Sequence, residues 1–155
     1  MRKILFTLLV FCITAGTVFA ATSQDALNFF NKYVNAANSY NPVITTMYSP
    51  NAKIIRQIVK PDGSVVTRET NTQRYISEMR KGQAVAKIRQ YKNYYTNITV
   101  TSLGNNTFKI SSLRRPSGES YKLKAYKVVK EQPNGKWVIT EEMMQTKVQM
   151  LINAK

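Results

Sequence analysis

The apolar positions of the chain first recur with the period of a helix. One such run spans residues 23–37 and places apolar side chains three or four residues apart, at Leu27, Phe30, Val34 and Ala37. Pro42 favours the start of a short second helix that ends at Tyr48. Thr70, with Gln73 three residues later, resembles a capping box and predicts a third helix that ends at Gly82. The pattern therefore predicts three helices.

Elsewhere the apolar positions alternate, which is typical of strands. Residues 52–59 and 64–69 flank a turn and predict a hairpin. Four further strands are predicted, separated by turns rich in Gly, Asn and Pro, at residues 84–101, 107–115, 119–130 and 136–148. The first of these is long for one strand, so we expect a bulge or bend within it. The order is helix, helix, hairpin, helix and four-strand meander in one α+β domain.

The first twenty residues resemble a secretory signal peptide. Arg2 and Lys3 precede an apolar stretch, and Val18-Phe19-Ala20 offers a cleavage site with small residues at its first and third positions. We therefore expect residues 1–20 to be removed and residues 21–155 to form a single domain. No later apolar run has the length of a membrane span. The prediction is an exported protein, either in a bacterial periplasm or secreted.

Cysteine and histidine are nearly absent. The single cysteine, Cys12, lies within the predicted signal peptide, and Phe11 precedes it where a lipid-attachment site requires a small residue. The sequence contains no histidine, which excludes imidazole acid–base catalysis and zinc sites built on His and Cys. An enzyme with this composition would have to use Asp, Glu, Tyr or Lys. We predict no cofactor and no metal.

Three segments resemble parts of a known superfamily. They are residues 29–40 in the first helix, residues 47–54 at the first strand, and residues 134–142 at the last turn and strand. With the element order, they resemble the nuclear transport factor 2-like superfamily, which includes SnoaL-like cyclases and ketosteroid isomerases. The resemblance implies a cone-like fold, in which a curved antiparallel sheet, a hairpin plus a meander, wraps around the N-terminal helices and leaves an apolar pocket. It implies no single function, because this fold hosts enzymes, carriers and assembly modules.

The core and the pocket are predicted from alternation and helical spacing. The expected core residues are Leu27, Phe30, Val34, Ile76, Met79, Ile88, Ile110, Leu123, Trp137 and Ile139. The expected pocket-lining residues are Tyr48, Tyr75, Met79, Tyr94, Tyr126 and Trp137. A buried tyrosine is more often a core side chain with one satisfied hydroxyl than a catalytic group.

Glu141 and Glu142 are the weak catalytic candidates. Isomerases of the resembled superfamily use an acidic base in an apolar cavity. Because neighbouring residues of a strand point to opposite faces, one of these two carboxylates faces inward. A salt bridge to a lysine is the favoured interpretation of the inward member, since ion pairs also perturb pKa values. An isomerase, cyclase or hydrolase is thus the alternative hypothesis.

Positive charge is the strongest functional signal outside the fold. The chain has 23 Lys and Arg against 8 Asp and Glu, with a net charge of +15. Basic residues alternate with apolar ones in two predicted strands, so we expect a cationic strip on the outer sheet face, with Tyr91 and Tyr95 continuing it. The strip comprises Lys87, Arg89, Arg114, Arg115, Lys122 and Lys124.

Such a strip suits anionic lipid headgroups or acidic envelope polymers. A solvated face that prevents aggregation is the plainer interpretation. Nucleic acid is disfavoured, because exported proteins rarely meet it. The hypothesis is an exported, non-catalytic binding module for an anionic membrane lipid or envelope polymer. The alternatives are a pocket-based enzyme or a subunit-assembly domain of an envelope complex, and the resemblance also allows a homodimer through the open sheet face.

Overall fold

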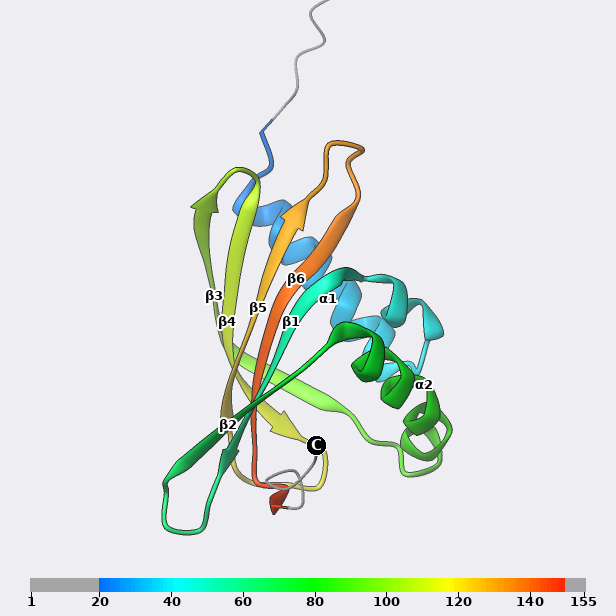
Figure 1. The fold of residues 1–155 in the computed structure, drawn as a ribbon, viewed down its shortest axis with the longest axis vertical. Coiled ribbons are helices and arrows are strands. Elements are labelled where there is room, and N and C mark those ends of the chain that lie inside the picture. The colour runs from blue at the N-terminus through cyan, green and yellow to red at the C-terminus, as the bar shows by residue number, and fades with distance from the viewer. Residues whose placement is uncertain (1–19, 150–155) are drawn as a thin grey trace, which may run out of the picture.

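The computed structural model describes residues 20–149, in which one curved six-stranded sheet holds the helices on its concave side (Figure 1). The helices are α1 (Ser23–Asn38), the 3-10 helix η1 (Pro42–Thr46) and α2 (Thr72–Ile88). The strands are β1 (Tyr48–Val59), β2 (Val65–Thr70), β3 (Asn93–Gly104), β4 (Thr107–Pro116), β5 (Leu123–Glu131) and β6 (Trp137–Thr146). The predicted signal peptide, Cys12 included, lies outside the described residues except for Ala20. No helix of the described part is long and apolar enough to cross a membrane.

The sheet has the order β2-β1-β6-β5-β4-β3. The predicted hairpin is β1–β2 and the predicted meander is β3–β4–β5–β6, and all of these pairs are antiparallel. The hairpin and the meander are joined by one parallel pair, in which β1 lies beside β6 and Ile54 is opposite Glu142. A parallel pair needs a long connection between its strands, and β2, α2 and the first three strands of the meander provide it. The predicted α+β class is confirmed, with a mixed sheet.

Helix α1 begins at a capping box. The Thr22 hydroxyl accepts a hydrogen bond from the Asp25 backbone N–H, and the Asp25 carboxylate accepts one from the Thr22 N–H at 3.0 Å. Both bonds satisfy donors that a helix start leaves free. The helix then buries one face against the sheet, through Ala26, Phe29, Phe30, Tyr33 and Ala36.

Helix α2 corrects the prediction for residues 70–101. Asn71 caps the helix instead of Thr70, and the helix runs through Gly82 to Ile88. Gly82 does not end the helix. Its backbone is not in the left-handed conformation that a helix-ending glycine adopts, and an added side chain would meet no neighbour. The chain leaves the helix at Gln90, which has a positive φ of 51°. The strand predicted from residue 84 therefore begins only at Asn93.

This correction moves three predicted residues. Ile88, expected in the core, is 83% exposed. Lys87 and Arg89 lie at the C-terminal end of α2, where the helix dipole favours cations, and not on a strand. The expected irregularity does occur in β3, where the register shifts between Thr96 and Thr99.

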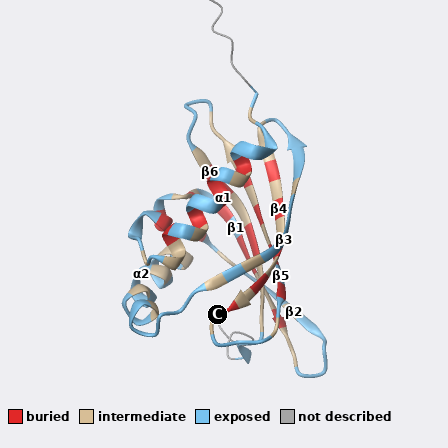
Figure 2. Ribbon diagram, turned by 180° about the vertical axis from the view of Figure 1, so that it is seen from behind, coloured by how far each residue is buried: buried red, intermediate tan, exposed pale blue. Residues whose placement is uncertain are grey.

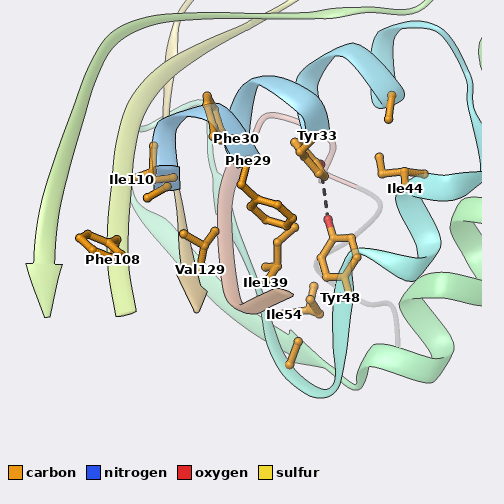
Figure 3. Packing of buried hydrophobic residues seen from close by; sticks show 13 residues of the cluster. Phe29, Phe30, Tyr33, Ile44, Tyr48, Ile54, Phe108, Ile110, Val129 and Ile139 are labelled. Atoms are coloured by element: carbon orange, nitrogen blue, oxygen red, sulfur yellow. Dashed lines mark hydrogen bonds between the residues drawn. The ribbon is translucent and has the colours of Figure 1, made fainter. Parts of the chain in front are cut away.

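The core lies where α1 crosses the concave face, and Figure 2 shows the buried residues concentrated on α1 and the central strands. Phe30, Ile54, Ile110, Val129 and Ile139 are at most 2% exposed and pack together there (Figure 3). Of the predicted core, Phe30, Ile110, Leu123 and Ile139 are buried. Five others are half-buried against the cluster, namely Leu27, Val34, Ile76, Met79 and Trp137.

Candidate functional site

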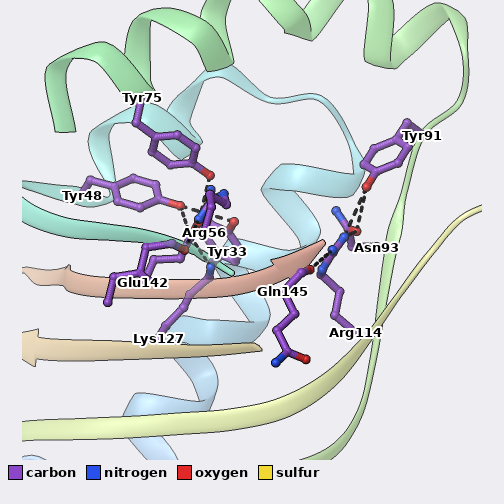
Figure 4. A network of polar contacts seen from close by, with 11 residues as sticks. Tyr33, Tyr48, Arg56, Tyr75, Tyr91, Asn93, Arg114, Lys127, Glu142 and Gln145 are labelled. Atoms are coloured by element: carbon purple, nitrogen blue, oxygen red, sulfur yellow. Dashed lines mark hydrogen bonds and ion pairs between the residues drawn. The ribbon is translucent and has the colours of Figure 1, made fainter. Parts of the chain in front are cut away.

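A single buried carboxylate lies at the centre of a polar network between the sheet and α2. Glu142 of β6 is fully buried, and side chains from β1, β5 and α2 surround it (Figure 4). Its Oε1 lies 2.8 Å from Nη2 of Arg56 and accepts a hydrogen bond of 3.0 Å from the Tyr75 hydroxyl. Its Oε2 pairs with the Lys127 ammonium and accepts a hydrogen bond of 2.5 Å from the Tyr48 hydroxyl. Four donors therefore occupy the carboxylate.

The surroundings of Glu142 keep it ionised. Burial alone would raise the pKa of this carboxyl, but Lys127 and Arg56 hold the pKa well below its usual range. Burial raises the pKa of Tyr75 well above its usual value, and the Glu142 charge adds to this effect. A general base works best with a pKa near the working pH and with a free lone pair. Glu142 has neither, so its arrangement is suited to holding Arg56 and the tyrosines in position.

Glu141 lies on the opposite side of the sheet. Its Oε1 accepts a hydrogen bond of 2.5 Å from the Tyr126 hydroxyl. Burial and this bond raise the pKa of Tyr126 to about 12. The two candidate carboxylates thus face opposite ways, and only Glu142 faces the interior.

A cavity of about 370 Å³ opens beside the Glu142 network. Residues from α1, η1, α2 and four strands line it, and most of the helical ones are small or apolar. The apolar and small lining residues are Ala36, Ala37, Ile44, Met79, Gly82, Ala86 and Met144. The polar lining residues are Tyr33, Tyr40, Thr45, Arg56, Tyr75, Gln83, Tyr91, Asn93 and Arg114. No carboxylate is among the lining residues of the described chain.

Arg114 corrects the predicted cationic strip. It is 5% exposed and points to the concave face, because Ile110, Ser112 and Arg114 alternate inward along β4. Its Nη1 donates to Oδ1 of Asn93 at 2.7 Å and to the Tyr91 hydroxyl at 3.3 Å (Figure 4). Its Nη2 donates to the Gln145 carbonyl at 2.8 Å.

The other five residues of the predicted strip are on the surface in two groups. Arg115 and Lys124 belong to the outer sheet face and Lys122 directly precedes β5; the Arg115 guanidinium stacks 4.6 Å from the Tyr94 ring. Lys122 and Lys124 are exposed while Leu123 is buried, as the alternation predicts. Lys87 and Arg89, at the end of α2, form the second group.

Of the six residues predicted to line the pocket, two do so. Tyr75 and Met79 line the cavity, whereas Tyr48 lies in the Glu142 network beside it. Trp137 stacks on Phe29 in the core. The remaining two, Tyr94 and Tyr126, lie on the outer sheet face beneath basic side chains. Tyr95, placed with the basic face from the sequence, instead packs edge-on to Phe30 in the core.

Sequence reasoning missed the cations of the interior. Arg56 falls between Ile54 and Ile58 in the alternation of β1, and Lys127 between Ala125 and Val129 in that of β5. A charged residue at a core-facing position of a strand is the signal that could have found them. Among residues 20–149, no group of three or more acidic, His or Cys side chains is placed to hold a metal ion.

Comparison with known proteins gives a match in structure. No family model matches the chain, and no curated protein has a matching sequence. A nuclear transport factor 2-like protein of unknown function from Shewanella oneidensis superposes with a TM-score of 0.59 at 14% identity, over 80% of this chain and 98% of that one. A candidate ketosteroid isomerase from Shewanella frigidimarina gives a TM-score of 0.54 at 17% identity, over 81% and 96% of the two chains.

This chain has the nuclear transport factor 2-like fold. The predicted resemblance is therefore confirmed for the fold. A candidate scytalone dehydratase from Novosphingobium aromaticivorans shares it too, with a TM-score of 0.50 at 11% identity over 78% of this chain and 80% of that one. Members of a nuclear transport factor 2-like fold differ in function, so the likeness carries no activity to this chain.

Proposed function

We propose that this chain is a non-catalytic module that binds a small, largely apolar molecule in the cavity beside Glu142. The observation that carries the proposal is the cavity itself, whose volume of about 370 Å³ falls in the range of small-molecule sites. Ala36, Ala37 and Ala86 give it small walls on two helices, and Met79 and Met144 give it adaptable apolar ones.

The chemistry around the cavity supports binding without catalysis. The one carboxylate beside it, Glu142, already accepts from four side chains and is held ionised by Arg56 and Lys127. Tyr75 at the wall has a raised pKa and stays protonated, so it is a hydrogen-bond donor and not a base. A pocket-based isomerase, cyclase or hydrolase would need a proton acceptor that the described lining does not supply.

Filling the mouth of the cavity tests this function. Gly82 lines the cavity on α2, and a side chain added there meets no atom within 4 Å, so Gly82→Trp places an indole at the opening without a clash at Cβ. Ala84→Trp is the matched control, because Ala84 is exposed on the same helix and does not line the cavity. With the neutral dye Nile red as probe, we expect Gly82→Trp to weaken binding at least tenfold and Ala84→Trp to leave it unchanged. Equal binding by both variants would place the dye outside the cavity.

A second function, docking on an anionic membrane, is favoured by the surface at the end of α2. Ile88 is 83% exposed and lies between Lys87 and Arg89. No acidic residue occurs between Glu78 and Glu119. We propose that this end of the protein rests on anionic lipid, with Ile88 entering the apolar region. Each basic residue near such a surface contributes about 1 kcal/mol, and the exposed isoleucine favours lipid over a soluble polymer.

Co-sedimentation with vesicles separates this function from the first. We expect binding to vesicles that contain phosphatidylglycerol, weakened by salt, and none to pure phosphatidylcholine. The double reversal Lys87→Glu/Arg89→Glu should abolish sedimentation. A matched reversal at two other exposed lysines, Lys32→Glu/Lys136→Glu, makes the same charge change and should weaken sedimentation much less. If the two double variants lose binding equally, net charge alone attracts the protein and the end of α2 is not the docking surface.

A further inference from the structure

Two residues that line the cavity each carry a buried polar atom without a hydrogen-bond partner in the described chain. The atoms are Nε of Arg114 and the hydroxyl oxygen of Tyr40. Among the described residues, these are the only buried side-chain nitrogen or oxygen atoms without a partner. More than nine in ten buried polar groups in proteins are hydrogen-bonded. Both exceptions belong to residues that line one cavity, so a molecule bound there is a candidate partner for them.

Arg114 is also a buried charge without a counter-ion. Its three acceptors are an amide oxygen of Asn93, a phenol oxygen of Tyr91 and the Gln145 carbonyl, and all three are neutral. Within residues 20–149, no carboxylate oxygen lies within ion-pair distance of its guanidinium. An arginine keeps its charge in a protein, and a buried charge is costly unless an opposite charge compensates it. The neutral partners therefore fix the orientation of the guanidinium but leave its charge uncompensated.

The charges around the cavity do not balance. Arg56, Lys127 and Arg114 are buried or nearly buried cations on the concave face, and Glu142 is the one buried carboxylate among the described residues. Arg56 and Lys127 already share that carboxylate. Two of the three cations, Arg56 and Arg114, line the cavity. The interior is thus positive and favours an anionic ligand.

Tyr40 is held in an uncommon backbone conformation that fixes its position. Its φ of 57° lies in the left-handed region, which residues other than glycine rarely adopt. Its carbonyl accepts a hydrogen bond of 2.5 Å from the Gln83 amide, which ties the end of α1 to α2. This left-handed conformation ends α1 in a Schellman motif, in which the Tyr40 N–H donates to the Ala37 carbonyl and the Asn41 N–H to the Ala36 carbonyl at 2.9 Å. The end of the helix therefore fixes the position of the residue that carries the unpartnered hydroxyl.

We propose that the cavity binds a carboxylic acid with an apolar body, whose carboxylate accepts hydrogen bonds from Nε of Arg114 and the hydroxyl of Tyr40. This inference rests on the proposed cavity function and names its ligand class. One carboxylate supplies the single negative charge that Arg114 lacks, whereas a sulfate or phosphate would bring further oxygens that also need hydrogen-bond donors. Ala36, Ala37 and Met79 then contact the apolar body.

Matched acids and amides test the head group directly. The probes are decanoate against decanamide and 2-naphthoate against 2-naphthamide, so that one pair is flexible and the other flat. Each competes with Nile red at neutral pH. We expect at least one acid to bind at least tenfold more tightly than its amide. Equal affinity within both pairs would overturn the carboxylate assignment, and so would tighter binding of decyl sulfate than of decanoate.

Variants assign the preference to the two residues. Tyr40→Phe removes only the hydroxyl, and we expect it to weaken the acid severalfold and leave the amide unchanged. Arg114→Gln should abolish the preference, and Arg114→Lys, which keeps the charge without Nε, should restore only part of it. If Tyr40→Phe and Arg114→Lys both keep the full preference, the carboxylate binds elsewhere. If Nile red and both pairs fail to bind the unmodified protein, the cavity function itself fails, which is a different result from equal affinity.

Discussion

The substitution Glu142→Gln removes a charge from the interior and keeps the shape of the side chain. Arg56 and Lys127, whose side chains are 16% and 4% exposed, then lose their shared counter-ion. Breaking a buried ion pair in this way costs about 3–5 kcal/mol. Lys127 limits the loss, because burial already lowers its pKa and lets it release its proton, whereas the Arg56 guanidinium stays charged. We therefore expect the free energy of unfolding to fall by about 3 kcal/mol. This is a large part of the total, which is about 5–15 kcal/mol for a typical domain.

Equilibrium unfolding in urea measures this loss. The single tryptophan, Trp137, packs on Phe29 and Phe108 in the core, so its fluorescence reports unfolding. The midpoint should fall with an unchanged slope. Glu69→Gln is the matched control, because its ion pair with Lys53 is about half exposed and should contribute little to stability.

The pH dependence gives an independent readout of the same charge. The pKa of Glu142 is lowered in the folded protein, so its contribution is fully present above the unfolded value of about 4.3 and is lost as the pH falls below it. The acid limb of the stability profile should therefore be shallower in Glu142→Gln. A variant as stable as the unmodified protein, with the same acid limb, would refute this reasoning. A more stable variant would favour a catalytic Glu142, because functional groups commonly reduce stability.

Two further predictions concern α2 and the tyrosines. Gly82→Ala should raise the free energy of unfolding by about 0.5–1 kcal/mol, because Gly82 is inside a helix and the added methyl group meets no other atom. Thermal unfolding measures this gain, and a lower stability would show that the position requires glycine. Burial raises the pKa of several tyrosines in the folded protein. Above about pH 10 these tyrosines ionise more readily in the unfolded state, so the free energy of unfolding falls as the pH rises. Between pH 10 and about 12 this decline should be shallower in Tyr126→Phe, whereas an unchanged profile would contradict the raised pKa of Tyr126.

The pattern of apolar positions predicts most helices and strands of this fold. It fails where the same residues fit both the spacing of a helix and the alternation of a strand. Along β5, Leu123 and Ala125 point inward and Lys124 outward, as a period of two requires. Residues 86–89 alternate equally well, with apolar Ala86 and Ile88 between basic Lys87 and Arg89, yet they form the end of α2 and its C-cap. Gly82 reads as a helix end in the sequence, but no neighbour or backbone angle forces one there. Only the tertiary structure decides between the two interpretations.

The site was less predictable than the fold, because it depends on pairing between distant strands. Alternation puts Arg56 and Lys127 on core-facing positions, but it does not say which carboxylate they meet. Glu142 lies opposite Ile54 across a parallel pair and opposite Lys127 across an antiparallel one. The parallel β1–β6 pairing has no local signal, so the network that it assembles has none either.

The parallel pair also determines when the chain can fold. Strands β1 and β6 are the first and the last strand of the described sequence, so they pair only after α2 and the four strands between them have been synthesised. Strand β6 is the last of the six described strands to be synthesised, and it carries the carboxylate that neutralises Arg56 and Lys127. A nascent chain that lacks β6 would have to bury the Arg56 guanidinium without its counter-ion. We expect such chains to remain unfolded, so that folding depends on the presence of β6.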